Sequence, residues 1–125
     1  GKSIRDWIYV DDHCEAVMLA LQKGKSGESY NISASNELNV LTVVKKLLTL
    51  LDKPPSNLQF GEGRPGEDLR YSLDSSKIRK ELGWRHKMDS DVGFQKTIQW
   101  YVANENRLEN LPKNILSSTP WKVLS

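Results

Sequence analysis

Arg64 and Arg70 lie close together in the stretch Arg-Pro-Gly-Glu-Asp-Leu-Arg-Tyr-Ser-Leu-Asp. A guanidinium is planar, stays charged at any working pH and donates hydrogen bonds in pairs to phosphate oxygens. Pro65 and Gly66 are typical of the central positions of a tight turn, so they predict a bend beside Arg64. Residues 69–73 alternate between apolar and polar, which predicts a half-buried strand with Arg70 pointing outward. The stretch is therefore either a phosphate clamp or a solvated turn.

Two other motifs match catalytic or cofactor-binding patterns, but their neighbouring residues do not predict the structure that each pattern requires. Residues 61–66 match G-x-G-x-x-G, but that fingerprint needs a helix after its last glycine, and Pro65 indicates a bend followed by a strand. Asp11, Asp12 and His13 place carboxylates beside an imidazole, a pairing used in acid–base catalysis. Neighbours at a helix start seldom face one another, and capping of the helix explains the aspartates. No catalytic residue is assigned in this chain.

Composition excludes several classes of protein. The 125 residues suffice for one domain with a core, and 18 Lys and Arg against 16 Asp and Glu give a net charge of only +2. Nucleic-acid binding is not expected from so small a basic excess, and no apolar run has the length of a membrane span. Cys14 is the single cysteine, and no Cys or His cluster has metal-site spacing, so we expect a cytoplasmic protein without a metal.

Periodicity and turn residues predict an α/β chain with few short strands and about four helices. Strands are expected at residues 4–10, 28–33, 58–60 and 69–73. A first helix is expected from Asp11 or Asp12 to Gly24, and a second from Asn39 to Pro54-Pro55. A third is expected from Asp74 to Gly83, and a fourth begins at Asp89 or Ser90.

Two of the predicted helices carry apolar faces that should point inward. On the first, the face consists of Cys14, Val17, Met18 and Leu21, so Cys14 is interpreted as a packing residue and not as a nucleophile. On the second, it consists of Val40, Val43, Val44, Leu47, Leu48 and Leu51. The tail, residues 111–125, is apolar enough to lie in a groove of this or another chain.

Five blocks in a fixed order carry a family resemblance. They are Arg5 to His13, Gly27 to Ile32, Arg64 to Asp74, Glu81 to Trp84 and Thr97 to Tyr101. Up to about Asn106 the chain resembles the C-terminal part of the dTDP-glucose 4,6-dehydratases, which are extended short-chain dehydrogenase/reductases. The resemblance implies a substrate-binding lobe over residues 1–110, a C-terminal tail over residues 111–125, and a Rossmann core that is missing here.

The resemblance also implies an activity for the parent enzyme, a lyase. NAD would take hydride from the sugar C4, water would leave across C5 and C6, and the hydride would return to C6. NAD would be bound by the N-terminal Rossmann domain, so this chain would hold no cofactor and would be inactive alone. Its expected partners are the dTDP-sugar substrate, its own Rossmann domain and, since the parent enzyme would be a homodimer, a second copy.

Five residues are assigned to substrate binding by the resemblance. Arg5 and Arg64 match arginines that contact the nucleotide phosphates, and Asn39 matches an asparagine at the same diphosphate once one gap is placed ahead of it. Glu67 stands where the family commonly has histidine, and its carboxylate would repel a diphosphate unless a cation such as Arg70 neutralises it.

Two other interpretations of the chain stay open. It could be part of another sugar-nucleotide epimerase or dehydratase that uses the same arginines. It could also be an interaction module that docks through its apolar tail. The missing core would leave the edge of the strand at residues 28–33 unpaired. The isolated chain would then pair that edge with another copy or lose stability.

Overall fold

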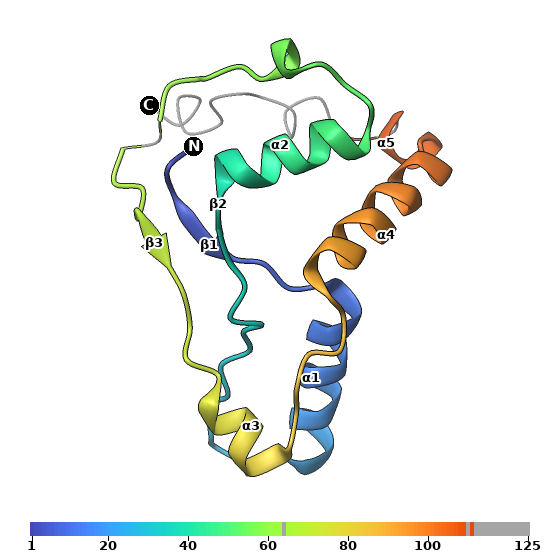
Figure 1. The fold of residues 1–125 in the computed structure, drawn as a ribbon. Helices are drawn as coiled ribbons and strands as arrows, with labels where there is room; N and C mark the ends of the chain where they lie inside the picture. Colours follow the sequence, from blue (N-terminus) through green and yellow to red (C-terminus); the bar gives the residue numbers. More distant parts are fainter. Residues whose placement is uncertain (64, 110, 112–125) are drawn as a thin grey trace.

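The three strands of the described chain form one small sheet. The computed structural model describes residues 1–63, 65–109 and 111, and its strands lie in the order β2-β1-β3. β1 (Ile4–Asp6) pairs antiparallel with β2 (Glu37–Asn39) and parallel with β3 (Arg70–Tyr71), as Figure 1 shows. Segments more than thirty residues apart in the sequence are thereby brought side by side.

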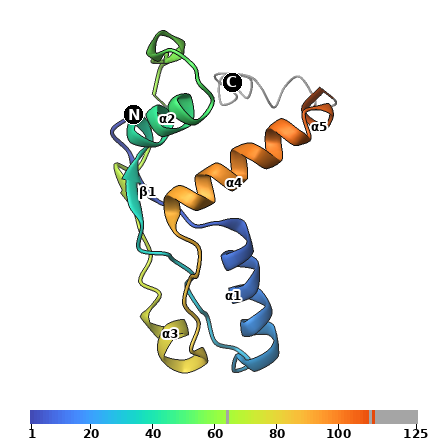
Figure 2. The ribbon, with the colours of Figure 1, turned by 45° about the vertical axis from the view of Figure 1, so that its right-hand side comes forward.

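The described residues also contain five α-helices, one more than the sequence predicts. They are α1 (Val10–Lys23), α2 (Val40–Leu50), α3 (Ser76–Leu82), α4 (Ser90–Ala103) and the additional short α5 (Asn106–Glu109), with a 3-10 turn, η1 (Pro55–Asn57), after α2. Figures 1 and 2 show α2 at the sheet end of the molecule, α1 beside α3 at the opposite end, and α4 leaving the junction between them. The predicted α/β class is confirmed.

Local capping chemistry sets several helix boundaries as predicted. The Asn39 side chain accepts a hydrogen bond from the Thr42 amide at 2.8 Å and begins α2. Asp89 begins α4 by accepting from the amides of residues 91 and 92. Gly83 ends α3 in the left-handed conformation, with φ +70°. Asp74 binds the Ser76 amide at 2.8 Å, although the N-cap position of α3 is Ser75. These boundaries depend on neighbours in sequence, which makes them predictable.

The predicted start of α1 is wrong. Its N-cap is Tyr9, without a side-chain capping bond, and both aspartates lie inside the first turn. Asp12 is buried and reaches across the fold, where its two oxygens accept from the amides of Lys87 and Met88, each at 3.0 Å. The carboxylate therefore satisfies two backbone donors from a distant segment and is not available for capping.

The face of α1 that was expected to be buried is exposed in this chain. Cys14 is exposed, and the exposed fractions of Val17, Met18 and Leu21 are 46%, 51% and 79%. We call these four residues the α1 outer face. The side of the helix that packs inward carries Ala16, which is fully buried. The prediction that Cys14 is a core residue is therefore wrong for the described chain.

All four strand predictions need correction. β1 covers only Ile4–Asp6 of the predicted stretch 4–10, and α1 begins at Val10. Residues 28–33 are described and form no strand, although Tyr30 and Ile32 pack their side chains against the core; both edges of β1 are occupied by β2 and β3. Residues 58–60 follow η1 without forming a strand. β3 covers only two residues of the predicted stretch 69–73, and its flank Leu69 is 74% exposed. Strand pairing depends on distant partners, which alternation alone does not identify.

The buried core of this part of the molecule is small. Ala16 and Ile78 are fully buried and Trp84 is 3% exposed, and they pack together between α1 and α3. Partly buried apolar residues surround them: Ile8, Leu19, Tyr30, Ile32 and Leu82. The apolar tail beyond Leu111 lies outside the described residues.

Asp12 should be a stability determinant, and Asp11 is its matched control. Replacing Asp12 by alanine leaves two amides without their acceptor, so we expect the free energy of unfolding of the full-length protein to fall by about 1–3 kcal/mol. Asp11 is exposed, and Asp11→Ala should change it by less than about 0.5 kcal/mol. Urea denaturation of both variants tests this, and equal effects would contradict the role of Asp12.

Candidate functional site

The two described arginines of the predicted site project from opposite faces of the sheet. Residues paired directly across neighbouring strands share a face, and consecutive residues alternate. Arg70 and the predicted site residue Asn39 both pair with Ile4, and Glu37 pairs with Asp6, so these side chains lie on one face. Arg5 stands between its strand neighbours Ile4 and Asp6 and points to the other. The register therefore separates Arg5 from Arg70.

Arg5 holds the loop that carries the predicted bend. Its Nη1 donates to the main-chain oxygens of Ile4 at 2.8 Å and Asp68 at 3.0 Å, and its Nη2 donates to the Glu67 carboxylate at 3.3 Å. The Arg5 and Glu67 side chains are 28% and 39% exposed. The structure thus brings together two of the predicted site residues, Arg5 and Glu67, although they are 62 positions apart.

Arg70 is engaged by a partner that the sequence did not indicate. Its Nε and Nη2 donate to the two oxygens of Glu37 at 2.8 and 2.6 Å. Hydrogen bonds from Arg70 and Ser72 lower the pKa of Glu37, and the bond to Glu37 raises the pKa of Arg70. Arg70 is therefore paired with Glu37 and not with Glu67.

Asn39 lies where β2 passes into α2. Its Oδ1 accepts from the Thr42 amide, so the acceptor end of the side chain is committed to the helix cap. The amide group Nδ2, which carries two donors, is the end able to bind an anion. A helix N-terminus favours negative charge, so capping and ligand binding are compatible at this residue.

Arg64 itself lies outside the described residues. The turn that follows it is described, and Gly66 has the predicted positive φ, +72°. Residues 67–69 then lead into β3 and not into a helix. The glycine pattern at residues 61–66 is accordingly not followed by the helix N-terminus that a dinucleotide requires.

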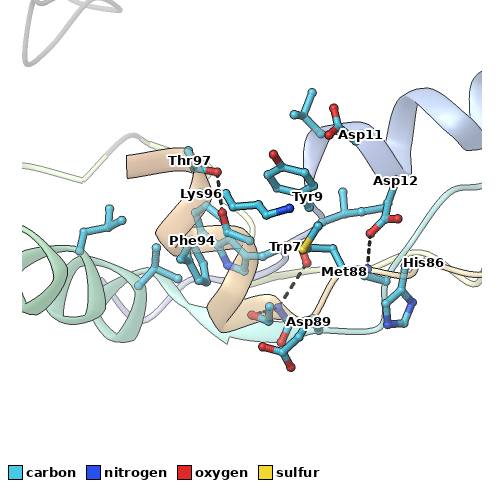
Figure 3. A pocket seen from close by; sticks show the side chains of 18 of the residues that line it. Trp7, Tyr9, Asp11, Asp12, His86, Met88, Asp89, Phe94, Lys96 and Thr97 are labelled. Carbon is cyan, nitrogen blue, oxygen red and sulfur yellow. Dashed lines mark hydrogen bonds between the residues drawn. The ribbon is translucent and has the colours of Figure 1, made fainter. Parts of the chain in front are cut away.

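A cavity of about 1010 Å³ lies between α2, α4 and residues 7–12. Figure 3 shows Phe94, Lys96 and Thr97 of α4 at one end of it, and Asp12 with His86 at the other. Its walls are largely apolar and aromatic; Trp7 and Phe94 pack with ring centroids 6.1 Å apart. Sequence reasoning missed this cavity, because its lining comes from segments that only the fold brings together.

Two of the three acids that line the cavity bind backbone amides. Asp12 binds the amides of residues 87 and 88, and Asp89 caps α4. His13, the imidazole of the Asp-Asp-His motif, is exposed on α1. Within the described residues no three metal-binding side chains gather at one place, and no helix is long and apolar enough to cross a membrane. Asp11, His86 and Lys96 also line the cavity and carry ionisable side chains.

Comparison with known proteins identifies the family. The family model described as GDP-mannose 4,6 dehydratase matches residues 1–97. The chain belongs to this family. It is 40% identical to the dTDP-glucose 4,6-dehydratase of Escherichia coli over 125 residues, which cover 94% of this chain and 35% of the relative.

Solved structures of the extended short-chain dehydrogenase/reductases agree with this assignment. DesIV, a dTDP-glucose 4,6-dehydratase from Streptomyces venezuelae with NAD and TYD bound, is similar with a TM-score of 0.81 and 38% identity, over 85% of this chain and 33% of that one. UDP-glucose 4-epimerase from Bifidobacterium longum, in complex with NAD+ and UDP, gives a TM-score of 0.71 and 27% identity, over 83% and 31%. The chain spans about a third of the length of these relatives and matches the C-terminal part of the dehydratase structures.

The Glu37–Arg70 pair should be visible in a titration. Because hydrogen bonds lower the pKa of Glu37 in the folded state, its stabilising effect should persist above the unfolded pKa and disappear as the pH falls through the folded value. Carboxyl NMR of the full-length protein should give Glu37 a low midpoint that rises in Arg70→Ala. Glu28, whose pKa is lowered by Lys77, is the internal control and should not move. An unchanged Glu37 midpoint in the variant would contradict the pairing.

Proposed function

We propose that this chain is the part of a dTDP-glucose 4,6-dehydratase that binds the diphosphate of the nucleotide sugar. The observation that carries the proposal is the position of Arg5, which is fixed on the central strand beside the 65–68 turn in a chain 40% identical to such an enzyme. Arg64 is proposed to complete the diphosphate contacts, because it occupies a position that matches the family pattern. Asn39 matches that pattern too, but it pairs with Ile4 and so lies on the face of Arg70, opposite Arg5.

The chemical step would belong to the complete protein. In the proposed reaction, NAD accepts hydride from the sugar C4, water is eliminated across C5 and C6, and the hydride returns to C6. The described residues offer no glycine-rich turn at a helix N-terminus, so NAD would be held by the remainder of the protein. The role of this chain is to bind and orient the diphosphate.

We further propose that the remainder of the protein covers the α1 outer face. Four apolar or thiol side chains at helical spacing are exposed there, which is the pattern of a helix packed on both sides. The relatives are about three times as long as this chain, so a covering body of the same polypeptide is expected. Residues 28–33, which form no strand here, adjoin the same end of the molecule.

Cys14 reports directly on whether this face is covered. In the native full-length protein, maleimide labelling of the Cys14 peptide should be at least about tenfold slower than in the urea-unfolded protein, because a covered thiol reacts only when the structure opens. Peptide-level mass spectrometry measures both rates. Equal labelling in the two states would show that the α1 outer face is open to solvent.

Arg64 provides the test of diphosphate binding. Arg64→Ala in the full-length protein should weaken binding of thymidine diphosphate by about 1.5–3 kcal/mol, the range for charge-assisted hydrogen bonds. Calorimetric titration measures the change. Arg85→Ala is the control, because Arg85 is exposed in the segment between α3 and α4 and should leave the affinity unaltered. Equal affinities of Arg64→Ala and the parent would refute the assignment.

A second candidate is another sugar-nucleotide enzyme with the same phosphate contacts. The similarity to UDP-glucose 4-epimerase favours it, since the shared fold extends over 83% of this chain. Competition between thymidine and uridine diphosphate sugars for the full-length protein separates the two candidates. Preference for the thymidine nucleotide, with release of a 4-keto-6-deoxy product, supports the dehydratase; preference for the uridine nucleotide supports the alternative.

A further inference from the structure

We propose that Glu67 competes with the ligand's phosphates for Arg5, and that nucleotide binding displaces its carboxylate. This inference deepens the proposed function and rests on Arg5 as a phosphate contact. Glu67 then sets the affinity of the site, because its carboxylate holds the guanidinium while no nucleotide is bound.

The contacts of Arg5 divide into a fixed group and an exchangeable one. The bonds to the main-chain oxygens of Ile4 and Asp68, at 2.8 and 3.0 Å, join the guanidinium to the central strand and to the loop. The bond to Glu67 is made by a flexible side chain that is 39% exposed. Rotation of that side chain would free Nη2 while Nη1 keeps the guanidinium in place. The cation is thus held in position independently of the carboxylate.

The length of the Glu67 contact also marks it as the exchangeable one. Charge-assisted bonds between nitrogen and a carboxylate are commonly about 2.7–2.9 Å long, and this one is 3.3 Å. The Glu37–Arg70 pair on the other face uses both carboxylate oxygens, at 2.8 and 2.6 Å. Glu67 contributes one oxygen to Arg5, so a phosphate able to accept two hydrogen bonds can replace it.

Charge makes this displacement necessary. The four side chains Arg5, Glu67, Arg70 and Glu37 form two ion pairs, so their charges cancel. A diphosphate that approaches Arg5 meets the negative carboxylate of Glu67 at the same nitrogen. The carboxylate has to leave, and the lost ion pair and any remaining repulsion reduce the affinity by about three- to tenfold.

The inference is tested by calorimetric binding of thymidine diphosphate to the full-length protein and its variants. Glu67→Gln keeps the size of the side chain and removes its charge, so it should bind about three- to tenfold more tightly than the parent. Asp68→Asn is the matched control: it removes the same charge one position later, while Arg5 meets Asp68 at the main-chain oxygen. Its affinity should change by less than about twofold.

A second pair of proteins separates displacement from a new contact made by glutamine. In an Arg5→Ala background, Glu67→Gln should give no gain in affinity, because the guanidinium for which Glu67 and the phosphates compete is absent. A gain that persists there, an unchanged or weaker affinity of Glu67→Gln, or an equal gain from Asp68→Asn would overturn the inference while leaving the proposed function intact. If the parent protein fails to bind thymidine diphosphate, the proposed function is wrong and the inference falls with it.

Discussion

The central strand β1 is the constraint on which the arrangement of the site depends. It has only three residues, yet it pairs with β2 on one edge and with β3 on the other. The Ile4 amide donates to the Leu69 oxygen at 2.7 Å, and the Ser3 oxygen accepts from the Val40 amide at 3.0 Å. The start of α2 and the end of the 65–69 loop are therefore both positioned by the same short piece of chain.

The alternation of β1 then gives the two arginines different roles. Arg70 shares a face with Glu37, and a bidentate pair forms there between the two outer strands, across β1. Arg5 points to the other face, where its partners come from the loop. A one-residue shift in register would exchange these faces. The Glu37–Arg70 pair between the outer strands and the direction of Arg5 toward the loop both follow from this one register.

Sequence reasoning succeeded where the determining chemistry is local. Asn39, Asp89 and Gly83 act on amides or on their own φ angle within a few positions, so residue type and spacing were sufficient. It failed where a side chain has a distant partner. Aspartate is common at helix N-caps, but the oxygens of Asp12 accept from amides 75 and 76 positions away.

The candidate site shows the same division. The family resemblance assigns Arg5 and Glu67 to one site, and in the structure their side chains form an ion pair. Nothing in the sequence indicated Glu37, because its link to Arg70 depends on β2 pairing with β1, and no strand was predicted over residues 37–39. Charge pairing across a sheet follows from register, and register is a property of the assembled fold.

The α1 outer face shows what an amphipathic pattern does and does not determine. The spacing of Cys14, Val17, Met18 and Leu21 predicts a buried side of the helix, but it does not identify what would cover that side. Among the described residues no segment buries that face, while Ala16 on the inward side packs against Ile78 and Trp84. Two apolar sides on one helix require two packing partners. Under the proposal that the remainder of the protein covers the α1 outer face, the small core between α1 and α3 is one of two packing environments of this helix.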